Sequence, residues 1–146
     1  MEPKKQFYSW EIYHQLVLTL RDKISLPDVI VSIGKGGTIP GVILAEKLGI
    51  TNLNFGIKSY SNFTRQEVLV YQTVNFEAYR DSKILIVDDL TDSGKTFEYV
   101  TNAFLKNYCE HIKTASVFVK EQSSYIPDFF VEKVPSDVWI VQPWEV

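Results

Sequence analysis

The sequence contains a single cysteine, Cys109, so the chain can form no internal disulfide bond. This absence excludes the disulfide-stapled folds of small secreted proteins and suits a reducing compartment. Cys109 follows apolar residues at helical spacing, and we interpret it as a packed thiol rather than a reactive one.

Long apolar runs and basic clusters are also missing. No run approaches the roughly 18 residues that a membrane-spanning helix needs, and the N-terminal segment lacks the apolar core of an export signal. The net charge is −3, and Lys4-Lys5 is the only basic pair near a terminus, which argues against nucleic-acid binding. We therefore expect a cytoplasmic protein with no membrane span and no nucleic-acid partner.

What is present is an ordinary globular composition, with 45% hydrophobic and 23% charged residues. A chain of 146 residues fits one domain and is long enough to bury a core. The sequence shows no internal repeat, linker or low-complexity segment. We expect a single domain over residues 1–146.

Apolar periodicity divides this domain into alternating strands and helices. Helical spacing follows Ser9, a plausible N-cap, and recurs over 40–48 and 96–108. Apolar and β-branched runs predict strands at 29–33, 53–57, 83–89, 113–119, 129–131 and 138–141. The polar stretch 58–80 predicts a mobile loop that includes a hairpin. Strand, glycine-rich turn and helix occur twice, which is typical of an α/β fold with a parallel sheet.

The most informative segment is the strand that ends in Asp88-Asp89, together with the turn from Thr91 to Thr96. A helix that starts after this turn offers unpaired backbone N–H groups and a partial positive charge. Gly94 lets the backbone approach a ligand closely, and nearby hydroxyls add donors. The turn is therefore predicted to bind a terminal phosphate.

The two carboxylates would repel that phosphate, so they need another partner. Vicinal hydroxyls of a ribose can donate to Asp88 and Asp89. A Mg²⁺ ion shared through the sugar or water would offset their charge, and Asp89 is the candidate metal ligand. A strand end followed by a helix cap would explain each feature alone, but it explains the whole pattern poorly.

Two other interpretations of the segment are weaker. Gly94-Lys95-Thr96 matches the end of a Walker A loop, but that motif needs a glycine at position 89, where this chain has Asp. A glycosidase-like acid–base pair of Asp88 and Asp89 is disfavoured because neighbours on a strand point to opposite faces.

The run from Ile86 to Thr96 resembles the phosphoribosyl-pyrophosphate (PRPP) signature of type I phosphoribosyltransferases. The resemblance implies that the two acids hold the ribose hydroxyls and that residues 92–96 surround the 5′-phosphate. The PRPP-binding residues that it implies in this segment are Asp88, Asp89, Leu90, Thr91, Asp92, Ser93, Gly94, Lys95 and Thr96.

Further blocks resemble the same family. Residues 33–37 resemble the pyrophosphate loop of 6-oxopurine enzymes, which implies that Lys35 and Gly36 bind pyrophosphate. Ser59-Tyr60 followed by Arg65 resembles the flexible hood loop, which implies that Arg65 also contacts PRPP. A plain glycine turn with a solvated lysine, and a surface arginine, are the alternatives for these two blocks.

The purine site is implied by the last two blocks. Residues 117–120 resemble the strand whose lysine, here Lys120, reads the purine 6-oxo group. Residues 137–144 resemble the C-terminal segment of bacterial xanthine-guanine phosphoribosyltransferases, with Trp139 stacking on the base and Ile140 presenting backbone groups. An ordinary strand-end lysine and a core tryptophan remain the alternatives.

The implied fold is that of type I phosphoribosyltransferases, a mostly parallel twisted sheet flanked by helices. We expect a core of about 29–120, a hood of about 1–28 and 121–146, a flexible loop of about 58–80, and a homodimer or homotetramer. The implied reaction moves the phosphoribosyl group of PRPP to N9 of guanine, xanthine or hypoxanthine, with Mg²⁺ as cofactor. Asp92 is the catalytic candidate, because it can accept the purine N7 proton; its alternative role is a helix cap or a loop brace.

Two other functions stay open. One is a regulator that binds PRPP or a nucleotide without turning it over. The other is a phosphoribosyltransferase that acts on a different base, against which Lys120 and the segment around Trp139 argue.

Overall fold

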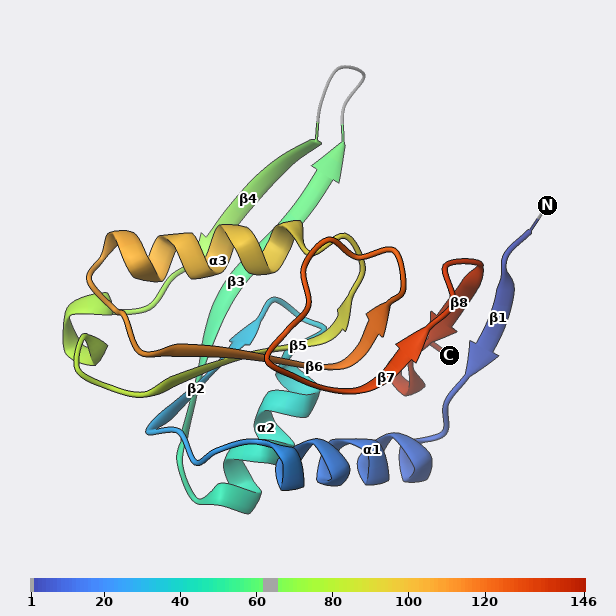
Figure 1. Ribbon diagram of the computed structural model, residues 1–146, viewed down its shortest axis with the longest axis horizontal. Coiled ribbons are helices and arrows are strands. Elements are labelled where there is room, and N and C mark those ends of the chain that lie inside the picture. Colours follow the sequence, from blue (N-terminus) through green and yellow to red (C-terminus); the bar gives the residue numbers. More distant parts are fainter. Residues whose placement is uncertain (1, 62–65) are drawn as a thin grey trace.

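The computed structural model describes residues 2–61 and 66–146 of the chain (Figure 1). Within these residues, six strands form the main sheet in the order β4-β3-β2-β5-β6-β7, and β1 and β8 form a small sheet. The strands are β1 Lys4–Phe7, β2 Val29–Ile33, β3 Thr51–Ser61, β4 Gln66–Gln72, β5 Ile84–Thr91, β6 Ile112–Lys120, β7 Phe129–Val134 and β8 Val138–Val141. The helices are α1 Trp10–Lys23, α2 Thr38–Leu48 and α3 Lys95–Lys106, with short 3₁₀ helices η1 Phe76–Tyr79 and η2 Pro143–Glu145.

The centre of the sheet is parallel and buried. β2 pairs in parallel with β3 and β5, and β5 pairs in parallel with β6. Every residue of β2 is buried, as are the first four of β5, which explains their unbroken apolar sequences. The expected α/β fold with a mostly parallel sheet is confirmed.

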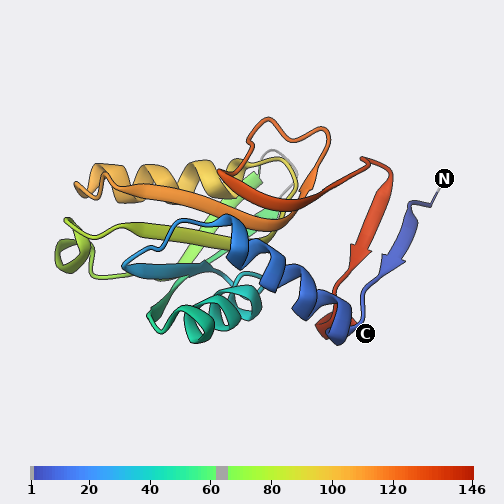
Figure 2. The same ribbon diagram turned by 60° about the horizontal axis from the view of Figure 1, so that its bottom comes forward.

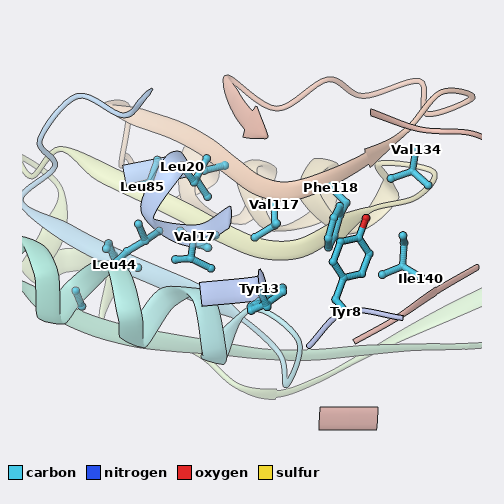
Figure 3. Packing of buried hydrophobic residues seen from close by; sticks show 14 residues of the cluster. Tyr8, Tyr13, Val17, Leu20, Leu44, Leu85, Val117, Phe118, Val134 and Ile140 are labelled. Carbon is cyan, nitrogen blue, oxygen red and sulfur yellow. The ribbon is translucent and has the colours of Figure 1, made fainter. Parts of the chain in front are cut away.

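Helices cover both faces of this sheet. α1 and α2 lie on one face and α3 on the other (Figures 1 and 2). Phe97 and Phe104 of α3 belong to one apolar cluster with Ile86 of β5. Figure 3 shows the cluster on the opposite face, where Tyr13 of α1 lies near Phe118 of β6. The sheet is therefore the middle of three layers.

Local signals in the sequence set the helix ends. The Ser9 Oγ accepts a hydrogen bond from the Ile12 N–H at 3.1 Å, so the expected N-cap of α1 is confirmed. α2 ends at Gly49, whose φ of 68° is left-handed, as is common after a helix. No helix in the described ranges is both long and apolar enough to cross a membrane.

The stretch expected to be a loop at 58–80 is largely regular structure, so that expectation was wrong in part. β3 continues to Ser61 and pairs antiparallel with β4, which confirms the hairpin, and η1 follows at Phe76–Tyr79. In the sequence, the alternation of apolar residues at Val68 and Val70 was only a weak indication of β4. Arg65 and the side chains of Ser59 and Tyr60 lie outside what the structure describes.

The sequence patterns did not predict β1. Lys4–Phe7 pairs in parallel with β8, with Lys5 opposite Trp139 in the register. This small sheet stands apart from the main one and brings the N-terminal segment beside the C-terminal segment (Figure 1). The four exposed residues of β1 lack apolar alternation, so only the distant partner strand makes them a strand.

Candidate active site

Two loops meet where β2 and β5 end. Since these strands are parallel neighbours, the turn after Ile33 and the turn after Thr91 leave the sheet at the same edge. Ligands of α/β sheets bind at this carboxyl edge. β5 extends two residues beyond the expected end at Asp89, so the acids lie within the strand rather than at its end.

A cavity of about 620 Å³ opens at this edge. The turn of residues 34–36 lines it, together with Asp88, Asp89 and Thr96, and Trp144 and Glu145 supply part of its wall. A second cavity of about 350 Å³ is lined by the turn from Leu90 to Phe97. Both cavities share Val68, Asp88 and Thr96, so they adjoin at Asp88.

The acid pair is held by short local contacts. Asp88 Oδ1 accepts a hydrogen bond from the Asp89 N–H at 2.8 Å, and Asp89 Oδ1 accepts one from the Leu90 N–H at 2.8 Å. Burial, and then the negative charge of Asp89, raise the pKa of Asp88 well above its usual range. A hydroxyl donor or a cation that reaches these carboxylates would relieve this repulsion.

The turn after β5 presents free backbone donors. The N–H groups of Ser93, Gly94 and Thr96 have no acceptor among the described residues, whereas the Lys95 N–H is bound by Ser93 Oγ at 3.3 Å. Gly94 has φ of 90°, a conformation that favours glycine. These amides lie at the N-terminus of α3, so the positive end of the helix dipole is at the same place. The arrangement suits a phosphate group.

The turn after β2 is a second set of donors. The N–H groups of Lys35 and Gly36 have no acceptor within the described ranges. Gly34 (φ 56°) is fixed on both sides: its N–H donates to the Phe55 carbonyl at 2.8 Å, and its carbonyl accepts from Thr38 Oγ1 at 2.8 Å and Asn54 Nδ2 at 3.0 Å. Lys35 is exposed at the cavity edge. This turn too is built to receive an anion.

Asp92 lies on the smaller cavity and is exposed. Its Oδ1 accepts a hydrogen bond from Gln122 Nε2 at 3.4 Å, and Gln122 Oε1 in turn accepts from Ser136 Oγ at 2.5 Å. Ser124 Oγ donates to the Ser93 carbonyl at 3.1 Å, so the segment after β6 braces the turn after β5. No backbone N–H in the described part of the chain donates to the Asp92 side chain, so the helix-cap alternative is not realised. The contact with Gln122 is of the kind that the loop-brace alternative expects.

The purine candidates lie together, but apart from the two cavities. Lys120, 7% exposed, donates a hydrogen bond from Nζ to the Val138 carbonyl, one residue before Trp139. Trp139 is 55% exposed, and Ile140 is buried in the core. None of the three lines either cavity, whereas Asp92 does. Trp139 is therefore not the core tryptophan of the alternative interpretation.

Several residues at the site were not predicted as site residues, among them the following three. Trp144 lines the larger cavity, Gln142 contacts Asp89, and Asn54 braces the turn after β2. The first two fall within residues 137–144, the block that resembles the family. That resemblance could have identified them as site residues. Asn54 carried no local signal, because its role depends on the pairing of β3 with β2.

Oxygen ligands are available for a magnesium ion. The carboxylates of Asp88 and Asp89 line the larger cavity. In the described part of the chain, no group of three or more His, Cys, Asp or Glu side chains could hold a metal alone. Mg²⁺ usually binds through one or two carboxylates and completes its shell with substrate oxygens and water, so the donor set fits that ion.

Known proteins share this architecture. A purine phosphoribosyltransferase from Pyrococcus horikoshii superposes with a TM-score of 0.87 at 31% identity, over 97% of this chain and 95% of that one. A hypothetical protein from Neisseria gonorrhoeae with bound ppGpp gives 0.87 at 26% identity, over 100% and 92%. A xanthine-guanine-hypoxanthine phosphoribosyltransferase from Helicobacter pylori shares the fold, with 0.86 at 23% identity over 97% and 94%.

A family model for the phosphoribosyl transferase domain matches residues 9–146. The match includes the turns after β2 and β5, the acid pair and the C-terminal segment. The sequence resemblance is thereby confirmed, and the chain belongs to the phosphoribosyltransferase family, with the type I fold.

Proposed function

We propose that the chain transfers the 5-phosphoribosyl group of PRPP to N9 of a 6-oxopurine and releases pyrophosphate. One observation carries the proposal: two turns with unpaired amide donors flank a pair of carboxylates, across two adjoining cavities. PRPP has a matching layout, with a monophosphate at one end, a pyrophosphate at the other, and ribose hydroxyls between them.

Each part of PRPP has a partner in this arrangement. The amides of Ser93, Gly94 and Thr96 would bind the 5′-phosphate. Asp88 and Asp89 would accept hydrogen bonds from the ribose hydroxyls. Lys35 and the amide of Gly36 would bind pyrophosphate, the lysine as a point charge. Leu90, Thr91 and Lys95 complete the wall of the phosphate turn.

The base would lie between Asp92 and the C-terminal segment. Trp139 offers an exposed face for stacking, and the backbone of Ile140 can meet the purine edge. Lys120 would exchange its hydrogen bond to the Val138 carbonyl for one to the purine 6-oxo group. An adenine amino group cannot accept that bond, which would leave a buried lysine unpaired and disfavour adenine.

Transfer requires one bond to form and one to break at C1′. Purine N9 bonds to C1′ while the bond from C1′ to the pyrophosphate oxygen breaks, and pyrophosphate leaves with that electron pair. The N7 proton passes to the Asp92 carboxylate. Mg²⁺, when held at Asp89, supplies positive charge that offsets the leaving group. Positioning by the two turns provides the remaining rate enhancement.

A spectrophotometric assay tests the proposal. Purified protein is mixed with PRPP and Mg²⁺ and, separately, guanine, xanthine, hypoxanthine, adenine and uracil. We expect nucleoside monophosphate to form with one or more of the three 6-oxopurines and little or none with adenine or uracil. Turnover confined to adenine or uracil would contradict the specificity and leave the phosphoribosyl transfer intact.

A second candidate function is sensing of a phosphorylated nucleotide without turnover. The Neisseria gonorrhoeae protein with bound ppGpp aligns with the whole of this chain, and two separate sets of amides without acceptors among the described residues suit a ligand with phosphates at both ends. Calorimetric titration with ppGpp, alongside the assay, separates the two. Tight binding with no turnover of any base would favour the sensor.

The assembled state is part of the same proposal. Phe7 and Trp10 are large side chains left more than half exposed in the single chain, on or beside the β1–β8 sheet. Contacts between copies would remove such surface from water. We propose a homodimer or homotetramer, which light scattering on the purified protein would measure.

A further inference from the structure

Gln142 reaches the acid pair from the C-terminal segment. It follows β8 and precedes η2, and its side chain is 2% exposed. Gln142 Nε2 donates a hydrogen bond to Asp89 Oδ2 at 3.4 Å. The contact joins residues 53 positions apart, so it exists only because the C-terminal segment folds against the carboxyl edge of the sheet.

The contact completes the surroundings of Asp89. Oδ1 accepts from the Leu90 N–H at 2.8 Å, and a Cβ built on Gly36 would lie 2.7 Å from the same oxygen. Gln142 therefore holds the second oxygen of a carboxylate whose first oxygen is already held. Because both carboxylate oxygens of Asp89 accept hydrogen bonds, rotation about its Cβ–Cγ bond is restricted. Each oxygen still has a second lone pair that can bind a ligand.

The choice of glutamine also points to function rather than packing. Gln142 Oε1 is buried and has no hydrogen-bond partner among the described residues. A buried acceptor without a partner is unfavourable, and an apolar side chain of similar volume would avoid that penalty. As a neutral donor, the amide orients the carboxylate without cancelling the negative charge that a cation requires.

We propose that Gln142 is a positioning residue that holds Asp89 in the orientation needed for Mg²⁺·PRPP. The inference rests on the proposed function, since it concerns how this site grips that substrate. Among the described residues, the Gln142 side chain makes no hydrogen bond to the base-site candidates Asp92 and Lys120. Its loss therefore lowers affinity for PRPP and leaves affinity for the purine unchanged.

The test uses Gln142→Met, which keeps volume and removes both the donor and the unpaired acceptor. Gln15→Met, at an exposed position of α1 remote from the cavities, is the matched control. Calorimetry with PRPP and Mg²⁺, without base, should show roughly tenfold weaker binding for Gln142→Met and wild-type binding for Gln15→Met. In the assay, KM for PRPP should rise similarly while KM for the base stays constant, and Tm should not fall.

The outcomes separate cleanly. If Gln142→Met binds Mg²⁺·PRPP as tightly as wild type, or if its Tm falls while its PRPP affinity holds, the positioning role is overturned and the proposed function stands. If wild-type protein itself fails to bind PRPP, the proposed function falls and this inference with it. Should Gln142→Met not fold, Gln142→Glu replaces it: retained affinity overturns the inference, and lost affinity in a folded protein supports it.

Discussion

Gly36 and Asp89 lie in direct contact across the two central strands. A Cβ atom at Gly36 would come within 2.7 Å of Asp89 Oδ1 and 2.8 Å of Cγ, closer than such atoms approach in proteins. The turn after β2 thus rests directly against the carboxylate that follows the apolar part of β5. The two halves of the site form one surface because this position lacks a side chain.

Gly36→Ala should therefore damage the site more than the fold. Gly36 is not among the glycines with positive φ, so alanine adds no backbone strain, but its methyl group must displace the Asp89 carboxylate or the turn. We expect PRPP affinity to fall at least about tenfold, with stability reduced by roughly 1 kcal/mol. Calorimetry and urea denaturation measure the two effects. Unchanged PRPP affinity would show that the contact is not part of the binding surface.

Gly94→Ala should destabilise the fold itself. Gly94 has φ of 90°, and a Cβ there would meet Tyr125 Cβ at 2.1 Å, so strain and a clash combine. Gly49→Ala is the matched control, because Gly49 has φ of 68° but nothing within 4 Å of the added atom. Urea denaturation should give a loss of about 1 kcal/mol for Gly49→Ala, and about 2–4 kcal/mol for Gly94→Ala. Equal losses of unfolding free energy in the two variants would mean that Tyr125 can move away from the added methyl group at no cost.

Asp92→Asn should slow turnover while leaving PRPP bound. The amide keeps the shape of the carboxylate and can still accept from Gln122 through its oxygen, but it is a far weaker proton acceptor. We expect kcat to fall roughly 100-fold or more, with PRPP affinity within about threefold of wild type. Asp22→Asn, at an exposed position of α1 where Asp22 pairs only with its neighbour Arg21 among the described residues, controls for the loss of one charge. Near-normal kcat would remove Asp92 from the role of base.

Asp88→Asn should stabilise the ligand-free protein at neutral pH. Burial and Asp89 raise the pKa of Asp88 in the folded state, so the folded state holds its proton more tightly than the unfolded state. The stability that protonation provides is present below the ordinary pKa of 3.8 and is lost as pH rises through the folded pKa. Asparagine never ionises, so its advantage, on the order of 1 kcal/mol or more, should appear at pH 7.5 and shrink toward pH 4.

Urea denaturation at several pH values between about 4 and 7.5 measures how much more stable Asp88→Asn is than the wild type. Asp81→Asn removes the same charge at an exposed turn and serves as the control. An Asp88→Asn protein that is less stable than wild type at pH 7.5 would mean that the carboxylate stabilises the empty fold. The charge of Asp88 beside Asp89 would then not destabilise the ligand-free protein.

Several parts of the fold followed from local patterns. The buried strand β5, the turn through Gly94 and the helix after it were predictable because hydrophobic period, glycine and capping chemistry act over a few residues. β1 was not, because Lys4–Phe7 is exposed and has no pattern of its own. The extension of β3 to Ser61 was missed for a similar reason: its polar residues become a strand only when β4 pairs with them.

The sequence alone pointed to the family and to the local features that suggest its site: an acid pair late in a buried strand and a glycine-containing turn that leads into a helix. These features are local, and their physical basis lies in neighbouring residues. Tertiary structure decided what surrounds them. Gly36 and Gln142 reach Asp89 because parallel pairing aligns β2 with β5 and because the C-terminal segment folds back. Contacts between residues far apart in the chain depend on the geometry of the whole sheet, which no short pattern encodes.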